Sequence, residues 1–415
     1  MAVCSAAKSP ILYRQGNHSS RRFSYMNGLS CIFRSYACAA GLLPLLLISN
    51  TALGQNSAPQ ATQLRAYYET ARKFEADGNW QQAEQIWRAV LKLASNDARA
   101  WTNLGVALNR QEKTTDAIEA WKQAIAINPK LPGPYFNLGL TLVRKGDYAD
   151  AISPLQQALR LAPGNDGARR ALAIALIAGE KFAEASREIA QLLFRSPKDS
   201  ALLELAAKSF LQQRRYQEAI TVLQRRLLLP NTTAFLFSQY GDALDGAGRT
   251  PEALQAYRKA VELDPESTLT RYGLGYLHWK LYQYNEAEQQ LLEVLRRAPN
   301  DPRASFTLGD LYLTRGEAER SLAFLKVARV AYPNEFDTRL ALGRALVLTG
   351  NLDRGIDELK AAVSLDEAIA DGHFQLGRAL IKAGRTEEGK VALQRAQALH
   401  DQQRKKEAER FRKLP

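Results

Sequence analysis

The sequence predicts an all-α fold built from repeated pairs of helices, and two observations support this prediction. Prolines recur every 34 residues, at Pro129, Pro163 and Pro197 and again at Pro265, Pro299 and Pro333. A fixed period of this length is typical of solenoid proteins, in which each repeat is one supersecondary unit. Within one period, apolar and small residues follow the i, i+3, i+4, i+7 spacing of a single helix stripe, as at Trp101, Leu104, Gly105 and Leu108.

Residues 1–54 are predicted to be an export signal region. Their apolar run at residues 37–49, ACAAGLLPLLLIS, has 13 residues and is too short for a helix that crosses a bilayer. Arg34 precedes this run and small residues follow it, which is the composition of a secretory signal peptide. The sequence leaves open whether translation starts at Met1 or Met26, and an uncleaved anchor is the alternative to a cleaved signal.

Residues 55–63 are predicted to be a short linker, and residues 64–403 are predicted to hold ten windows of 34 residues without insertion. The windows start at Leu64, Ala98, Pro132, Asp166, Ser200, Ala234, Thr268, Pro302, Phe336 and Ala370. In each window the spacing predicts two helices. An in-phase glycine separates the two helices in six windows, where a residue with positive φ ends a helix; these are Gly78, Gly146, Gly248, Gly316, Gly350 and Gly384.

These columns resemble the tetratricopeptide repeat family. The segments WTNLG and YFNLG, an in-phase column of alanines and the column of prolines carry the resemblance, which covers residues 64–403. It implies a right-handed α-solenoid of antiparallel helix pairs, with the first helix of each pair lining a concave groove. It also implies that the groove binds a protein or a peptide.

Two departures from the repeat pattern predict breaks in the array. Arg226 stands where a small residue is expected and the segment LLLPNTT follows, so we expect a looser joint near 226–235. The polar and basic residues 404–415 are predicted to be a capping helix or tail that covers the last repeat, because terminal repeats must shield an apolar face. The alternative is that this tail contacts an acidic surface.

A second stripe lies about 120° around each first helix from the core stripe, and the resemblance places it on the groove. The residues that we predict to bind a partner on or beside this stripe are Arg99, Asn103, Phe136, Asn137, Leu140, Tyr272, Tyr276, Trp279, Phe306, Arg344 and Arg378. Tyr272, Tyr276, Trp279 and Phe306 are the strongest candidates, because aromatic side chains outside the core act as binding anchors. The alternative is that neighbouring helices cover them. Asn103 and Asn137 resemble the start of the asparagine ladder that some family members use.

The sequence contains no recognisable catalytic, metal or cofactor site. All three cysteines lie before residue 39, and His278, His373 and His400 fall on separate predicted helices. The net charge is +13, but residues 1–54 hold five basic residues and no acidic one, so the body carries only a mild excess. We therefore expect no nucleic-acid partner, since such partners require a concentrated basic face. A membrane contact is expected only through the signal region.

The sequence thus favours a non-catalytic protein–protein interaction scaffold. We expect it to be exported, in the periplasm or cell envelope, to bind an extended peptide or a partner helix, and to support assembly or maturation of an envelope complex; a cytoplasmic location is the alternative. A second hypothesis is a regulatory or substrate-delivering subunit of a separate enzyme, such as a glycosyltransferase or a peptidase. A carbohydrate binder is a third.

Overall fold

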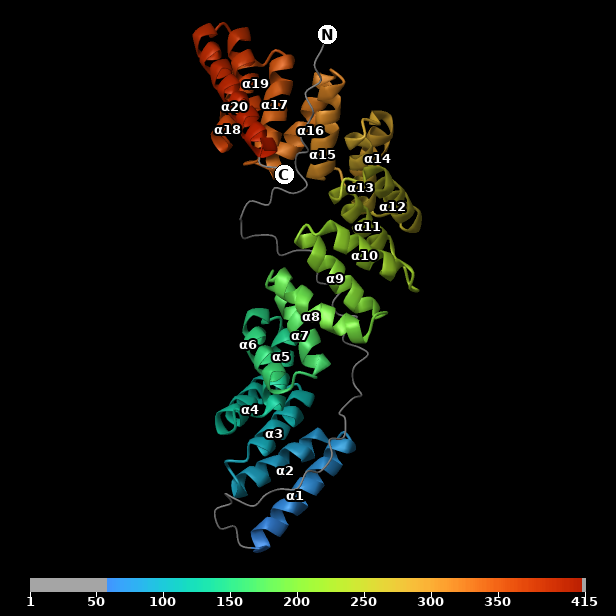
Figure 1. Ribbon diagram of the computed structural model, residues 1–415, viewed down its shortest axis with the longest axis vertical. Coiled ribbons are helices and arrows are strands. Elements are labelled where there is room, and N and C mark those ends of the chain that lie inside the picture. Colours follow the sequence, from blue (N-terminus) through green and yellow to red (C-terminus); the bar gives the residue numbers. More distant parts are fainter. Residues whose placement is uncertain (1–57, 413–415) are drawn as a thin grey trace. The chain divides into compact units, whose positions relative to one another are not determined.

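The computed structural model describes residues 58–412, so the predicted export signal at 1–54 lies outside the described residues. The described part contains twenty α-helices and no strand. Consecutive helices pack as pairs, and within each of the two units described below each pair also packs on the next, as Figure 1 shows. The predicted fold class, a right-handed α-solenoid of antiparallel helix pairs, is confirmed.

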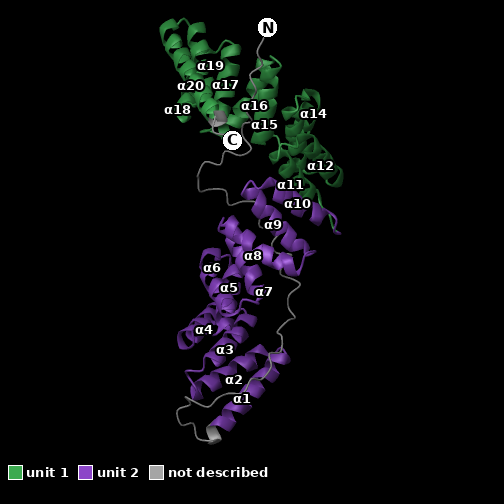
Figure 2. Ribbon diagram, in the orientation of Figure 1, with its two compact units in different colours: residues 1–23, 231–415 green, residues 24–230 purple. Residues whose placement is uncertain are grey.

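The described residues form two compact units, with the boundary between Pro230 and Asn231; Figure 2 shows them in different colours. The described part of unit 2 consists of α1 (Ala58–Ala76), α2 (Trp80–Leu93), α3 (Ala98–Arg110), α4 (Thr114–Ile127), α5 (Pro132–Lys145), α6 (Tyr148–Leu161), α7 (Asp166–Ala178), α8 (Phe182–Arg195), α9 (Ser200–Gln212) and α10 (Tyr216–Leu227). The described part of unit 1 consists of α11 (Ala234–Gly246), α12 (Thr250–Leu263), α13 (Thr268–Lys280), α14 (Tyr284–Arg297), α15 (Pro302–Thr314), α16 (Ala318–Ala331), α17 (Phe336–Leu348), α18 (Leu352–Leu365), α19 (Ala370–Lys382) and α20 (Thr386–Arg412).

The first helices of the repeats start where the period predicts them. From Ala98 onward, every odd-numbered helix begins at the predicted first residue of a window. The prediction differs at the N-terminal end, where α1 begins at Ala58. Residues 58–63, which we expected in a linker, are therefore helical, because nothing in APQATQ stops a helix after its first turn.

Small residues in the first helix let the second helix approach closely. A Cβ on Gly105 would lie 2.3 Å from the indole nitrogen of Trp121, and one on Gly139 would lie 2.5 Å from Leu155. The Trp121 ring is fully buried, and its N–H donates to the carbonyl of Thr102 at 3.1 Å. The glycine column is therefore a packing device, because it makes room for one large side chain of the partner helix.

Every first helix is followed by a residue with positive φ, and the ten residues stand 34 positions apart. Six are the predicted glycines, with φ between 73° and 87°. The other four are Glu112, Glu180, Arg214 and Tyr282, with φ between 57° and 63°. Side chains with a Cβ rarely adopt this conformation, so the repeat geometry imposes it on four turns that lack glycine.

The boundary between the two units lies within the stretch 226–235. Arg226 is buried in α10, and its Nε donates to the Glu204 carboxylate at 2.6 Å. Its Nη1 donates to the carbonyl of Pro230 at 3.1 Å. Asn231 has φ of 60°. A buried arginine in place of a small residue thus ends α10 early, at Leu227, and the chain turns before the next repeat.

The C-terminal residues extend a repeat helix and do not form a separate helix. Helix α20 runs without a break from Thr386 to Arg412. Its last buried side chain is Leu399, and residues 400–409 are exposed. Residues 404–409 thus form the exposed end of α20, and the capping role that we predicted for 404–415 stays a prediction. No helix within the described residues is both long and apolar enough to cross a membrane.

Candidate binding surface

The first helices of unit 1 form one surface, which we call the first-helix face. It consists of α11, α13, α15, α17 and α19, and each of these helices contacts the next one in this series. Residues 34 positions apart occupy the same place on successive first helices. One such set, the charged row, crosses all five helices; it consists of Asp242, Tyr276, Asp310, Arg344 and Arg378. The row therefore has an acidic end and a basic end.

Asp242 is a half-buried carboxyl group at the acidic end of the charged row. Burial raises its pKa to about 6, against the effect of the hydrogen bond that the Tyr257 hydroxyl donates to it at 2.5 Å. The nearby carboxylate of Asp245 raises the pKa further. Asp245 itself accepts hydrogen bonds from Thr250 and from the Lys280 ammonium, each at 2.7 Å. Asp245 is thus neutralised within the chain, whereas Asp242 has no cationic partner among the described residues.

Asp310 repeats this environment two repeats later. Burial raises its pKa above the ordinary range of an aspartate. The positive charge of Arg344 and a hydrogen bond from the Trp279 side chain oppose this shift. Two partly desolvated carboxyl groups therefore flank Tyr276 in the charged row. Such groups attract a cation more strongly than a fully hydrated carboxylate does, because less water screens them.

The four aromatic residues that we predicted as anchors are packed against their own neighbours. Tyr272, Tyr276 and Phe306 are only 4–5% exposed, and Trp279 is half-buried. The rings of Tyr276 and Trp279 lie 5.5 Å apart, between centroids, and the Arg303 guanidinium covers Tyr272 at 4.8 Å. The expectation that Tyr272, Tyr276 and Phe306 stand free of the core is wrong, because adjacent first helices pack along this stripe. Whether these rings contact a partner stays a prediction.

Comparisons with known proteins agree with this architecture. A model described as tetratricopeptide repeat matches residues 142–209 and 246–308, and one described as TPR repeat matches residues 107–146. Together with the ten helix pairs in one period, these matches decide the family. The chain belongs to the tetratricopeptide repeat family. The matching models describe a repeat and no catalytic domain.

Individual relatives of this tetratricopeptide repeat protein are distant. Cellulose synthase operon protein C of Salmonella typhimurium is 29% identical over 84 residues, which are 20% of this chain and 7% of that protein. MamA from Desulfovibrio magneticus RS-1 is 22% identical, with a TM-score of 0.39 over 42% of this chain and 99% of that chain. The Cut9–Hcn1 hetero-tetramer of APC/C is 13% identical, with a TM-score of 0.46 over 81% of this chain and 87% of that chain.

The other predicted site residues of this repeat protein lie at or near the surface. Arg99 and Arg378 are exposed. Asn103 on α3 and the equivalent Asn137 on α5 are half-buried. So are Phe136, Leu140 and Arg344. Helices α3 and α5 contact each other, so both asparagines belong to one surface of unit 2. Contact of these residues with a partner stays a prediction.

Five exposed apolar side chains in the first helices of unit 1 were not among the predicted site residues. Phe235, Leu269, Phe374 and Ile381 are each 40–43% exposed, and Leu348 is 57% exposed. Phe235 and Leu269 hold the window position that Arg99 holds in the second repeat, so the period itself contained the signal. Within the described residues, no group of three or more His, Cys, Asp or Glu side chains is placed to hold a metal ion.

Proposed function

We propose that this chain is a non-catalytic scaffold that binds a protein segment along the first-helix face of unit 1. The observation that supports the proposal is the charged row, in which the desolvated Asp242 and Asp310 stand at one end and Arg344 and Arg378 at the other. A partner segment that carries a basic side chain toward Asp242 and an acidic one toward Arg378 fits this row. Complementary charges of this kind set orientation and specificity more than they add affinity.

The test of this proposal is charge reversal at the basic end. Arg378→Glu changes an exposed side chain, so we expect the helical circular dichroism signal to stay unchanged while partner capture falls. Arg395→Glu is the matched control, since Arg395 is an exposed arginine of α20 in the same unit and outside the row. A photo-crosslinker at Arg378 then identifies the bound segment. Equal capture by both variants, or a crosslinked segment without an acidic residue near the crosslink, contradicts the proposal.

The proposal includes export to the periplasm or cell envelope and a role there in assembling or maturing a complex. Its support is the short apolar run at 37–49 with Arg34 ahead of it. N-terminal sequencing of the protein from its own cells tests this part. A mature chain that begins near Gln55 supports export, whereas a cytoplasmic chain that begins at Met1 or Met26 contradicts it.

A second candidate is a regulatory or substrate-delivering subunit of a separate enzyme. The observation that favours it is the local match to a protein whose name associates it with a cellulose synthase operon. Affinity purification of the full chain distinguishes the two candidates. A single stoichiometric enzyme that co-purifies supports the second candidate, and loss of that enzyme in Arg378→Glu places the contact on the charged row.

A further inference from the structure

A recurring hydrogen bond ties the fourth residue of five first helices to the turn that precedes the helix. In each case a side-chain nitrogen reaches the carbonyl oxygen six residues earlier. The five pairs are Trp101 with Ser95, Arg169 with Pro163, Arg271 with Pro265, Arg339 with Pro333 and His373 with Glu367, at 2.7–3.1 Å. The bond satisfies a carbonyl that the helix geometry leaves open. Three of the five donors are arginines, which bring a charge into a partly buried place.

The three arginines differ in their second partner, which is the residue 19 positions later on the second helix. Two of them form ion pairs with a glutamate: Arg169 with Glu188 at 2.6 Å and Arg339 with Glu358 at 2.9 Å. Arg271 instead donates to the amide oxygen of Gln290 at 3.1 Å. No carboxylate of the described residues lies within ion-pair distance of Arg271. The charge of Arg271 in the seventh repeat is therefore not neutralised by a glutamate, whereas the charges of Arg169 and Arg339 are.

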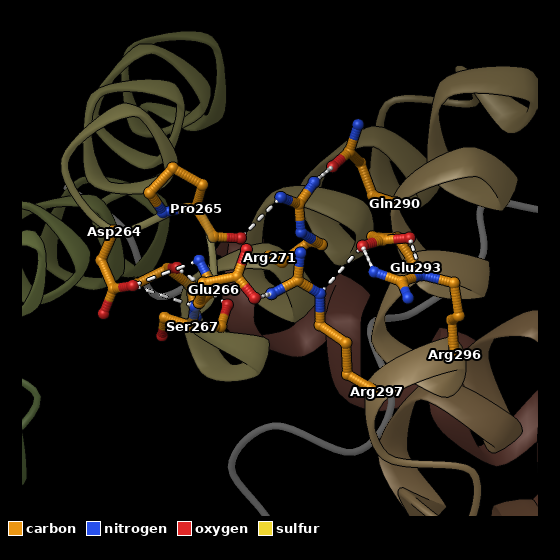
Figure 3. Close-up of polar contacts among 10 residues, drawn as sticks. Asp264, Pro265, Glu266, Ser267, Arg271, Gln290, Glu293, Arg296 and Arg297 are labelled. Carbon is orange, nitrogen blue, oxygen red and sulfur yellow. Dashed lines mark hydrogen bonds and ion pairs between the residues drawn. The ribbon is translucent and has the colours of Figure 1, made fainter.

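A cavity of about 430 Å³ opens beside this guanidinium, between α13 and α14. Its lining consists of Arg271, Gln289, Gln290, Leu292, Glu293 and Arg296. Figure 3 shows Arg271 held by Pro265 on one side and by Gln290 on the other. The Nε of Arg271 is buried without a partner, as is the Nε of Arg169. An Nε without a partner thus occurs in two of the three arginines. The cavity and the missing carboxylate distinguish Arg271 from the other two.

The one carboxylate in the lining does not neutralise Arg271. Glu293 accepts two hydrogen bonds from Arg296 and one from Arg297, each at 2.8 Å. These bonds, first those from Arg296 and then the one from Arg297, lower the pKa of Glu293 to about 2, so it stays ionised. Arg297 also pairs with Glu266, a highly exposed side chain. Among the lining side chains, two guanidinium groups, those of Arg271 and Arg296, therefore face one carboxylate, and the excess charge is positive.

We propose that this cavity binds a small oxyanion, a carboxylate or a phosphate, between the guanidinium groups of Arg271 and Arg296. The planar fork of an arginine matches the paired oxygens of such groups, and charge-assisted hydrogen bonds are the strong ones. The Arg296 side chain is 67% exposed, and its two hydrogen bonds to Glu293 use Nε and Nη2, which leaves Nη1 to donate to a ligand. Arg271 lies about 140° around α13 from Tyr276, so this site is separate from the charged row and does not depend on the proposed function.

Gln290→Glu is the decisive variant, because it gives Arg271 the carboxylate that Arg169 and Arg339 already have. The same arginine–glutamate ion pair already occurs in two repeats, at Arg169–Glu188 and Arg339–Glu358. The variant is therefore expected to fold with at least the stability of the parent chain. Isothermal titration calorimetry of the full chain with inorganic phosphate, and separately with acetate, measures binding at constant ionic strength. We expect the affinity for the preferred probe to fall roughly tenfold or more in Gln290→Glu.

Two further variants make the result specific. Arg296→Gln removes the second guanidinium and is also expected to weaken binding, whereas Arg395→Glu lies outside the cavity and is expected to bind like the parent chain. The stronger of the two probes identifies the oxyanion, and a short peptide compared with its C-terminal amide shows whether a free chain end is accepted. Absence of binding of both probes to the parent chain, or equal binding to the parent and Gln290→Glu, overturns the proposal.

Discussion

The indole of Trp121 fills the space that a Cβ on Gly105 would need, with the Cβ position only 2.3 Å from Nε1 of the ring. This contact joins α3 to α4 and has counterparts in other repeats, where Gly241 faces Tyr257 and Gly309 faces Leu325. A glycine inside a helix normally costs about 1 kcal/mol relative to alanine. The repeat retains it because the close approach buries a large side chain, which contributes about 1.5–3 kcal/mol.

Gly105→Ala is therefore expected to lower the free energy of unfolding by about 1–3 kcal/mol, since the added methyl group overpacks the contact with Trp121. Urea denaturation followed by circular dichroism measures the change. Gly133→Ala is the control, because the nearest atom to a Cβ there is a Thr102 methyl group at 3.8 Å. The control is expected to be neutral or stabilising, and a loss of similar size in both variants contradicts this account.

Glu112→Gly is expected to stabilise the chain, by about 1 kcal/mol or less. Glu112 has φ of 63°, and a left-handed conformation costs a residue with a Cβ about 1–2 kcal/mol. The greater freedom of glycine in the unfolded chain offsets part of the gain. Thermal melting measures the shift. The opposite exchange at an equivalent turn, Gly146→Ala with φ of 87°, should be destabilising; a loss of stability in Glu112→Gly argues against strain at this turn.

Asp242→Asn is expected to stabilise the chain at neutral pH and to have little effect at pH 4. The pKa of Asp242 is raised from 3.8 to about 6, so the folded state favours the protonated form. The ionised form destabilises the fold progressively as the pH rises from about 4 to 6. The amide keeps an acceptor for the Tyr257 hydroxyl and carries no charge, so the gain is about 2 kcal/mol or less above pH 6. Unfolding measured at both pH values checks this dependence.

Truncation after Gln403 is expected to leave the melting temperature almost unchanged, because residues 400–409 are exposed. Leu399→Ala is expected to destabilise unit 1 by about 2 kcal/mol, since that side chain is 9% exposed and packs at the end of the array. If truncation after Gln403 lowers the melting temperature as much as Leu399→Ala does, the last residues have a capping role after all.

The position of the three hydrogen-bonded arginines follows from the repeat period. Arg169, Arg271 and Arg339 each follow an in-phase proline by six residues. A side chain of that length at that spacing reaches back to the turn, so their contact was predictable from the period. The cavity beside Arg271 was not, because it depends on how α13 and α14 approach each other near Gly275.

The sequence alone determined the helix pairs, their phase and the small residues between them, because these features depend on spacings of a few residues along one chain. Nine of the ten first helices begin where the period places them. Only the tertiary structure decided which stripe residues face solvent. Tyr272 and Phe306 share the helical position of Thr102 and Phe374, yet the first two are buried and Phe374 is 40% exposed. The difference arises because exposure depends on the next helix and its side chains, and one repeat's periodicity carries no information about them.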